Sequence, residues 1–312
     1  MPSYELVSTL QGTTADLLWR QWGAFGVMTN YQTAQRAIDP EALILGSLAL
    51  SRLEPRVVDV VPSWVSHNHD RINVPRLKRL AQYFPAAQKG LPDLAAVAVA
   101  AGDAGWKPLL DGVPRAKRPS QPKPRAIRVR LINTPTLMLR MRMGMGVTAR
   151  ADILSYLIAN SDRGDRWASV STIAEALDFT PSAVRTAADE MTEAGFIEGI
   201  ASVAGGRGPS ARMFRVRGNI WNGILGGSTL GWWPWLEVYR FMNDLEERLA
   251  VAPSGTVTEY VETSLIRELM ERYPRAIEET QSDPPLPPED LEGWPVYLRD
   301  RLGRWRSALS QG

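Results

Sequence analysis

The pair Thr180-Pro181 constrains this chain more than any other feature, because it marks the start of a helix. A threonine hydroxyl accepts a hydrogen bond from a free backbone N–H at a helix N-terminus, and the missing N–H of proline does no harm at the first helical position. The helical pattern runs to about Ala194 and stops at Gly195, a residue type that ends many helices in the left-handed conformation. The sequence therefore predicts a short helix that begins at Pro181.

Two further helices are predicted upstream of this one. Thr148 can cap the first and Ser171 the second, and Asp178 and Phe179 make the turn that leads to Pro181. The apolar residues on one face of each helix are Ile153, Leu154, Leu157 and Ile158 in the first and Ile173, Ala174 and Leu177 in the second. We therefore expect three short helices that pack on one another.

Two strand-like runs follow the three helices. They cover Phe196 to Val203 and Ala211 to Arg217, and the turn residues Gly205-Gly206-Arg207-Gly208-Pro209 join them. The predicted order is helix, helix, turn, helix, strand, glycine-rich tip and strand.

This order resembles the winged helix-turn-helix domains of bacterial regulators, the MarR and ArsR types among them. The likeness rests on the spacing of Pro181, Ser182, Val184, Met191 and Gly195-Phe196-Ile197 behind the cap, and on the basic hairpin that follows. It covers under a quarter of the chain. It indicates the fold more specifically than the bound molecule, because some winged helices bind only proteins.

The resemblance implies a DNA-binding surface. In similar proteins the outward face of the third helix enters the major groove, where arginine binds guanine and serine or threonine reaches base edges or phosphate. Here that face and its cap carry Thr180, Ser182, Arg185 and Thr186. The hairpin residues expected to contact the minor groove or the DNA backbone are Arg207, Ser210, Arg212 and Arg215. The alternative is a solvent-exposed helix and basic hairpin in a winged domain that binds protein, and the acidic residues Asp189, Glu190 and Glu193 count against phosphate binding by the back half of the helix.

Charge is unevenly distributed although the net charge is only +2. Residues 112–151 contain ten basic residues and no acid, whereas residues 237–300 contain fifteen acids and six bases. Four prolines make residues 112–125 an extended linker. Its five basic side chains are predicted phosphate contacts: Arg115, Lys117, Arg118, Lys123 and Arg125.

The N-terminal part is predicted to be mostly helical, with helix starts at Asp39-Pro40, Pro55 and Asn73-Val74-Pro75. The helix after Asn73 echoes a second, degenerate helix-turn-helix. Its basic residues, expected to point outward toward phosphate, are Arg76, Lys78 and Arg79. The alternative is a solvated basic face on an ordinary helix. The predicted core residues near the start of the chain are Trp19, Trp22 and Phe25.

The segment from Leu137 to Met145 alternates in a manner that fits a strand, but Thr134-Pro135 and the Met and Leu content favour a helix. Amphipathic helices are also expected from Pro234, over about 257–273 and from Pro295. Gly226-Gly227-Ser228 lacks a following Asp-x-Asp or lysine and is interpreted as a turn, not a nucleotide site.

These observations predict a mainly α protein with four parts. They are a helical N-terminal domain (1–111), a basic linker (112–126), a winged domain with a small β-hairpin (127–218) and an acidic, Trp-rich helical domain (219–312). The absence of cysteine fits a reducing compartment, and neither a signal peptide nor an apolar run of about 20 residues is present. We expect a cytoplasmic location.

The predicted function is a DNA-binding transcriptional regulator that acts as a homodimer on double-stranded DNA, without a cofactor. The alternative is an antitoxin-like protein that neutralises a partner toxin through its acidic C-terminal part and regulates its own operon. The layout around the Arg-rich segment before Thr148 resembles actinobacterial regulators that accompany nucleotidyltransferase-like toxins. No nucleophile–base pair supports an enzyme, and His67 and His69 are too few for a predicted metal site.

Overall fold

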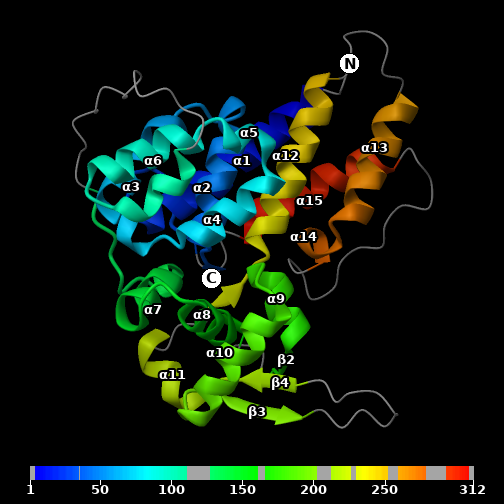
Figure 1. Ribbon diagram of the computed structural model, residues 1–312. Coiled ribbons are helices and arrows are strands. Elements are labelled where there is room, and N and C mark those ends of the chain that lie inside the picture. The colour runs from blue at the N-terminus through cyan, green and yellow to red at the C-terminus, as the bar shows by residue number, and fades with distance from the viewer. Residues whose placement is uncertain are drawn as a thin grey trace.

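The computed structural model is mainly α-helical, as predicted (Figure 1). It describes residues 4–34, 36–110, 127–160, 166–201, 212–225, 230–251, 259–278 and 293–308. The helices are α1 (Tyr4–Ala24), α2 (Pro40–Ala49), α3 (Val57–Asn68), α4 (Val74–Leu80), α5 (Pro85–Gln88), α6 (Leu91–Ala100), α7 (Leu137–Met145), α8 (Ala149–Asn160), α9 (Val170–Leu177), α10 (Pro181–Glu193), α11 (Gly218–Leu225), α12 (Trp235–Val251), α13 (Glu259–Arg272), α14 (Pro274–Glu278) and α15 (Trp294–Ala308). The strands are β1 (Arg36–Ala37), β2 (Ala168–Ser169), β3 (Glu198–Ala201), β4 (Arg212–Arg215) and β5 (Gly231–Trp232).

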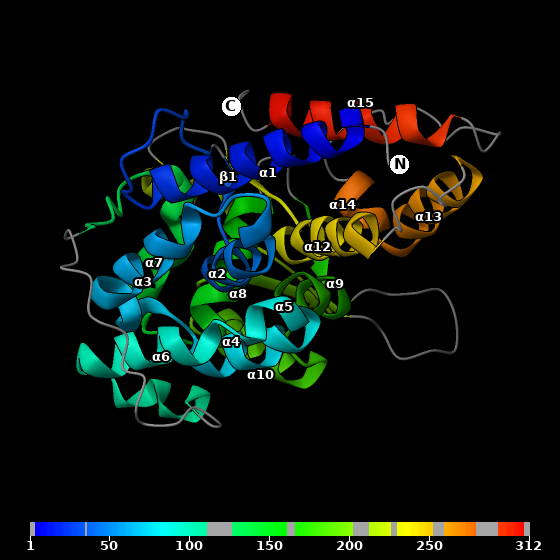
Figure 2. The same ribbon diagram turned by 90° about the horizontal axis from the view of Figure 1, so that it is seen from above.

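One hydrophobic core joins the two ends of the chain. It contains side chains from residues 6–109 and from residues 233–305, with Leu139 added from α7. Figure 2 shows α15 lying beside α1, and Trp305 of α15 packs against Trp233 at 5.9 Å and Phe241 at 5.6 Å between ring centroids. The predicted division into separate N-terminal and C-terminal helical domains is therefore wrong for the packing, because both parts bury their apolar faces in the same core.

A close approach of two helices helps to build this core. Gly46 lies on α2, where a Cβ atom would be 2.4 Å from Cδ1 of Tyr239 on α12. The Tyr239 hydroxyl accepts a hydrogen bond from Nε2 of Gln21 at 2.8 Å. The predicted core residues Trp19, Trp22 and Phe25 are confirmed as buried.

A second core is formed mostly by residues 137–232, with Ala37 added from β1. It contains the apolar faces of α7 to α10 and a three-stranded antiparallel sheet of order β2-β4-β3, in which Glu198 pairs with Arg215 and Ala201 with Arg212. β1 and β5 form a separate parallel pair. Strand β2 was not predicted, because two residues carry no periodic signal.

Several predicted helix starts are confirmed by their capping bonds. Asp39 Oδ1 accepts from the backbone N of Ala42 at 3.1 Å, and Asn73 Oδ1 accepts from that of Arg76 at 3.1 Å. Residues 137–145 form a helix, as the Thr134-Pro135 start and the Met and Leu content favoured over the alternating pattern. The cap of α9 differs from the prediction: Ser169 accepts from Thr172 N at 3.1 Å, two residues before the predicted Ser171.

The described helices are all too short or too polar to cross a lipid bilayer.

Candidate nucleic-acid interface

Helix α10 begins and ends where the sequence predicted. The Thr180 hydroxyl accepts a hydrogen bond from Ala183 N at 3.2 Å, Pro181 is the first helical residue, and Gly195 follows the helix with φ of 76°. The preceding turn contains Asp178 in the left-handed conformation, with φ of 53°. Asparagine and aspartate tolerate this conformation better than other residues with a Cβ, which explains how a short turn without glycine joins α9 to α10.

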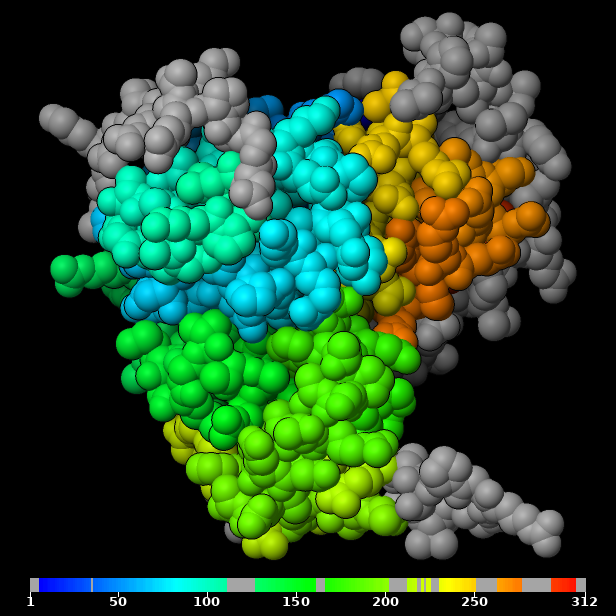
Figure 3. Space-filling model, in the orientation of Figure 1, coloured from blue at the N-terminus to red at the C-terminus, as the bar shows by residue number. Residues whose placement is uncertain are grey.

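Helix α10 has one buried and one exposed face. Val184, Ala187, Ala188 and Met191 are buried in the second core. The opposite face is exposed at Ser182, Arg185 and Thr186, as is the cap residue Thr180. Figure 3 shows the green atoms of this part of the chain on the lower front of the molecule, below the cyan N-terminal helices. The predicted orientation of α10 is thus present in the structure.

The two halves of the exposed face of α10 differ in charge. In the back half, Asp189 pairs with Arg212 at 2.5 Å and Glu190 with Arg150 at 3.5 Å. In the front half, Arg185 has no carboxylate within ion-pair distance among the residues that the structure describes. Because a helix N-terminus adds partial positive charge, the front half of α10 suits an anion better than the back half does.

The arginines of the sheet are largely occupied by carboxylates of the protein. Nε of Arg215 donates to Glu198 Oε2 at 2.7 Å, and the Arg215 guanidinium lies 4.5 Å from the ring centroid of Trp167. Arg217 also binds Glu198, and these two hydrogen bonds lower the pKa of that carboxyl. Arg212 remains 44% exposed beside Asp189. The predicted wing residues Arg207 and Ser210 lie outside the described residues.

The predicted outward orientation of Arg76 is wrong. Arg76 is fully buried, and its guanidinium donates to both oxygens of Asp39, to Glu41 and, from Nε, to the carbonyl of Leu177 at 2.8 Å. The helical pattern placed Arg76 correctly on α4, but α2 and the end of α9 cover that side of the helix. Arg76 therefore cannot contact phosphate.

Lys78 and Arg79 on α4 are exposed, but both have internal partners. Nζ of Lys78 donates to the carbonyl of Pro108 at 3.2 Å. Nε of Arg79 donates to Asp178 Oδ2 at 2.8 Å, and Tyr83 donates its hydroxyl to Asp178 Oδ1 at 3.2 Å. Residues of the N-terminal part, Arg79 and Tyr83, therefore bind the turn before α10 through Asp178. The five predicted linker contacts, Arg115, Lys117, Arg118, Lys123 and Arg125, lie outside the described residues.

A buried ion-pair cluster joins the two cores. Arg142 of α7 makes two hydrogen bonds to Asp152 of α8, at 2.7 and 2.9 Å, and two to Glu41 of α2, at 2.6 and 2.8 Å. Arg76 donates to Oε2 of Glu41 at 2.6 Å, an oxygen that Arg142 also binds, and completes the cluster with Asp39. All five side chains are 0–1% exposed. Because a buried charge without a partner is costly, this cluster fixes how the two cores meet.

The cluster shifts the pKa values of Asp39 and Asp152 in opposite directions. Burial acts to raise the pKa of Asp39, but the charge of Arg76 and its hydrogen bonds outweigh burial and hold that pKa below its ordinary value. Burial raises the pKa of Asp152 despite the opposing charge of Arg142. Arg142 belongs to the basic stretch singled out in the sequence, so part of that stretch serves packing rather than an anionic partner.

The sequence did not single out Glu41 or Asp152, nor did it indicate that Asp178 binds Arg79 of α4. An acid on an otherwise apolar helix was the available signal for Glu41, since Pro40 to Ala49 contains no other charge. His67 and His69 are too few for a predicted metal site. In the structure, His69 Nδ1 lies 3.2 Å from Asp103 Oδ2.

Loss of the cap hydroxyl should destabilise α10. We expect Thr180→Ala to lower the free energy of unfolding by about 0.5–2 kcal/mol, because the backbone N–H of Ala183 loses its acceptor. Thr180→Ser retains the hydroxyl and is expected to remain close to the wild type. Urea denaturation of the three proteins measures the difference, and equal stability of Ala and Ser variants would show that the cap contributes nothing.

Comparison of the chain with protein-family models, curated proteins and solved structures found no significant match. The function is therefore inferred from the geometry of the described residues.

Proposed function

We propose that residues 127–218 form a winged helix-turn-helix domain and that the protein is a transcriptional regulator that binds double-stranded DNA through α10. The observation that carries this proposal is the exposed front half of α10, where Arg185 stands between Ser182 and Thr186 with no described carboxylate partner. An arginine in this position can donate two hydrogen bonds to O6 and N7 of a guanine in the major groove.

The distribution of charge favours an approach by the N-terminal end of α10. Asp189 and Glu190 are on the back half, where Arg212 and Arg150 offset their charge. Docking by the front half keeps these acids away from phosphate, while Thr180 and the helix N-terminus can face the DNA backbone. Two copies of the chain would place two such helices about 34 Å apart on a pseudo-palindromic site.

The antitoxin-like alternative relies on free acidic side chains in residues 237–300. Several of these acids are already bound by the protein itself: for example, Asp244 accepts from the Tyr273 hydroxyl, Glu268 accepts from Arg248 at 3.1 Å, and Glu246 lies 3.7 Å from Arg52. These pairs support structural roles for the acidic helices, so we favour DNA as the partner.

Selection of bound DNA from a random pool tests the proposed function. The full chain is incubated with the pool at two salt concentrations, and bound sequences are compared. We expect one motif to be enriched at both, with weaker total binding at the higher salt because cation release accompanies phosphate contacts. Recovery of unselected sequences, or of none, at both concentrations would contradict the proposal.

Arg185→Ala is expected to weaken binding to the selected motif by about 1–3 kcal/mol, which corresponds to about 5- to 150-fold in Kd. The reason is the loss of both hydrogen bonds to one base. Arg267→Ala is a matched control, because Arg267 is a half-exposed arginine on α13 that pairs with Glu271. Fluorescence anisotropy with labelled duplex measures both variants; equal effects of the two would argue against a special role of Arg185.

A further inference from the structure

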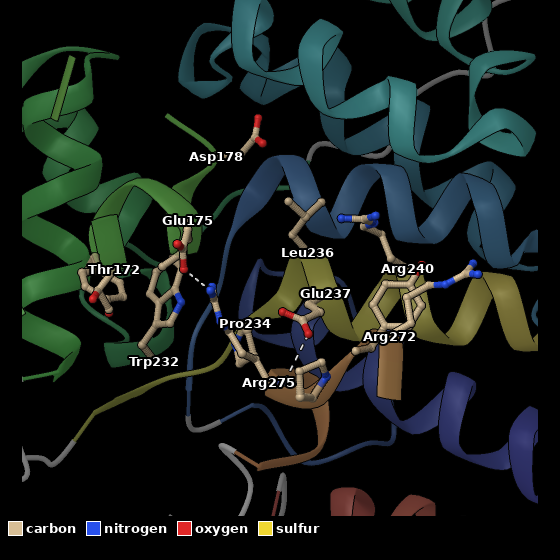
Figure 4. Close-up of a pocket in the computed structure, with 14 residues that line it drawn as sticks. Thr172, Glu175, Asp178, Trp232, Pro234, Leu236, Glu237, Arg240, Arg272 and Arg275 are labelled. Carbon is tan, nitrogen blue, oxygen red and sulfur yellow. Dashed lines mark hydrogen bonds and ion pairs between the residues drawn. The ribbon is translucent and has the colours of Figure 1, made fainter. Parts of the chain in front are cut away.

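A cavity of about 460 Å³ lies between α9 and the C-terminal helices (Figure 4). Thr172, Glu175 and Asp178 line it on the α9 side, and residues of α12, α13 and α14 line the other side. Its volume falls within the range of about 300–1,000 Å³ that is typical of small-molecule sites. The exposed residues of α10 do not line it, so the cavity is separate from the proposed DNA interface.

Three arginines line the cavity in different surroundings. Arg275 pairs with Glu175 across the cavity, as a dashed line shows in Figure 4, and Arg272 donates to a glutamate of its own helix at 2.7 Å. Arg240 differs from both, because no carboxylate within the described ranges lies within ion-pair distance of its guanidinium. Arg240 is therefore the cavity arginine without a described ion-pair partner, although the carboxylates of Glu175, Asp178 and Glu237 also line the cavity.

Arg240 is in contact with two tyrosine rings, whereas the other two arginines each pair with a carboxylate. Its guanidinium carbon lies 4.4 Å from the ring centroid of Tyr83 and 5.4 Å from that of Tyr273. Rings attract the face of a guanidinium, whereas its N–H donors lie in its plane. Stacking therefore leaves these donors available to an anion. Trp232 and Tyr156, in contact with each other, add apolar surface to the wall.

We propose that this cavity binds a small organic anion, a carboxylate or phosphate group on an apolar body. Arg240 is the principal cation, and Arg275 is the second, reached when the anion competes with Glu175. The aromatic wall receives the apolar body. This arrangement matches the usual division of a small-molecule site into a mostly apolar lining and a few polar groups that fix orientation.

The cavity is connected to the turn before α10. Arg240 stacks on Tyr83, whose hydroxyl donates to Asp178, the left-handed residue between α9 and α10. Glu175 belongs to α9 and loses a partner when an anion takes Arg275. Occupancy of the cavity therefore changes contacts of α9 and its turn, and we expect DNA and the anion to alter each other's affinity. This coupling, unlike the cavity site, rests on the proposed function.

Binding of defined probes to the full chain tests the site. Benzoate and phenyl phosphate carry the two anionic groups, and benzyl alcohol is a neutral control of similar size. Trp232 lines the cavity, so tryptophan fluorescence reports occupancy. We expect at least one anion to bind with Kd of about 1 mM or tighter and benzyl alcohol to bind at least about tenfold more weakly. Benzoate alone indicates a carboxylate ligand, and phenyl phosphate alone a phosphate ester.

Variants of the cavity arginines locate the probe. Arg240→Met and Arg275→Met are expected to weaken anion binding at least about tenfold, and Arg240→Lys, which retains the charge, to have a smaller effect. Arg267→Met outside the cavity should bind as the wild type does. Arg275→Met remains informative if Arg240→Met does not fold, because the Arg275–Glu175 pair is on the surface, with side chains 41% and 52% exposed.

The failures of the two proposals are distinguishable. The site is overturned if neither anion binds, if benzyl alcohol binds equally well, or if the arginine variants that fold bind as the wild type does. Unchanged DNA affinity in the presence of a bound anion overturns the coupling. Anion binding in a protein that selects no DNA supports the cavity site and contradicts the proposed function.

Discussion

Arg142→Met is expected to lower the free energy of unfolding by about 3–5 kcal/mol, the usual cost of removing one member of a buried ion pair. The variant replaces the aliphatic part of the side chain but not the guanidinium, and it leaves Glu41 and Asp152 buried with four fewer hydrogen bonds. Burial already raises the pKa of Asp152. Without Arg142 we expect Asp152 to be protonated and the contact between the two cores to weaken.

Arg150→Met is the control for this experiment. Arg150 lies on the neighbouring helix α8, is 54% exposed and pairs with a half-exposed glutamate, so its loss is expected to cost less than about 1 kcal/mol. Chemical denaturation followed by circular dichroism measures both. An Arg142→Met protein as stable as the Arg150→Met protein would show that the cluster does not hold the cores together.

Trp305→Ala is expected to lower the free energy of unfolding by about 3–5 kcal/mol, because removal of a buried aromatic side chain leaves a cavity among Trp233 and Phe241. The more informative expectation is where the loss appears. Since α15 and α1 share one core, hydrogen exchange should accelerate in α1 as well as in α15.

Val296→Ala provides the matched control on the same helix. Val296 is 50% exposed, so its truncation should change stability by less than about 0.5 kcal/mol. Faster exchange confined to α15 in the Trp305→Ala protein would indicate that the C-terminal helices form an independent domain, as the sequence alone suggested.

Local features of the chain were predictable because they depend on neighbouring residues. The cap at Thr180, the stop at Gly195 and the buried face of α10 all follow from side-chain chemistry and helical spacing within about 15 residues. The start of α9 was displaced by two residues, because Ser169 and Ser171 are both capable caps and only the pairing of β2 with β4 distinguishes them.

Features that depend on distant parts of the chain were not predictable in this way. In the sequence, Arg76 looks like one more basic residue on an amphipathic helix. It is buried because it binds Asp39 and the carbonyl of Leu177, which lies about 100 residues further on at the end of α9. The same holds for the shared core and for the cavity around Arg240, whose walls come from helices far apart in sequence. Periodicity reports which face of a helix is buried, but not what covers it.

Methylation interference at guanine N7 tests the central claim most directly, because N7 is one of the two atoms that an arginine contacts in the major groove. The selected DNA is sparsely methylated and then bound either by the wild type or by Arg185→Ala. We predict that methylation of one guanine in each half-site blocks the wild type and has no effect on Arg185→Ala at that position, whereas interference at other guanines is the same for both proteins. Identical interference patterns for the two proteins would contradict recognition of DNA by the exposed face of α10.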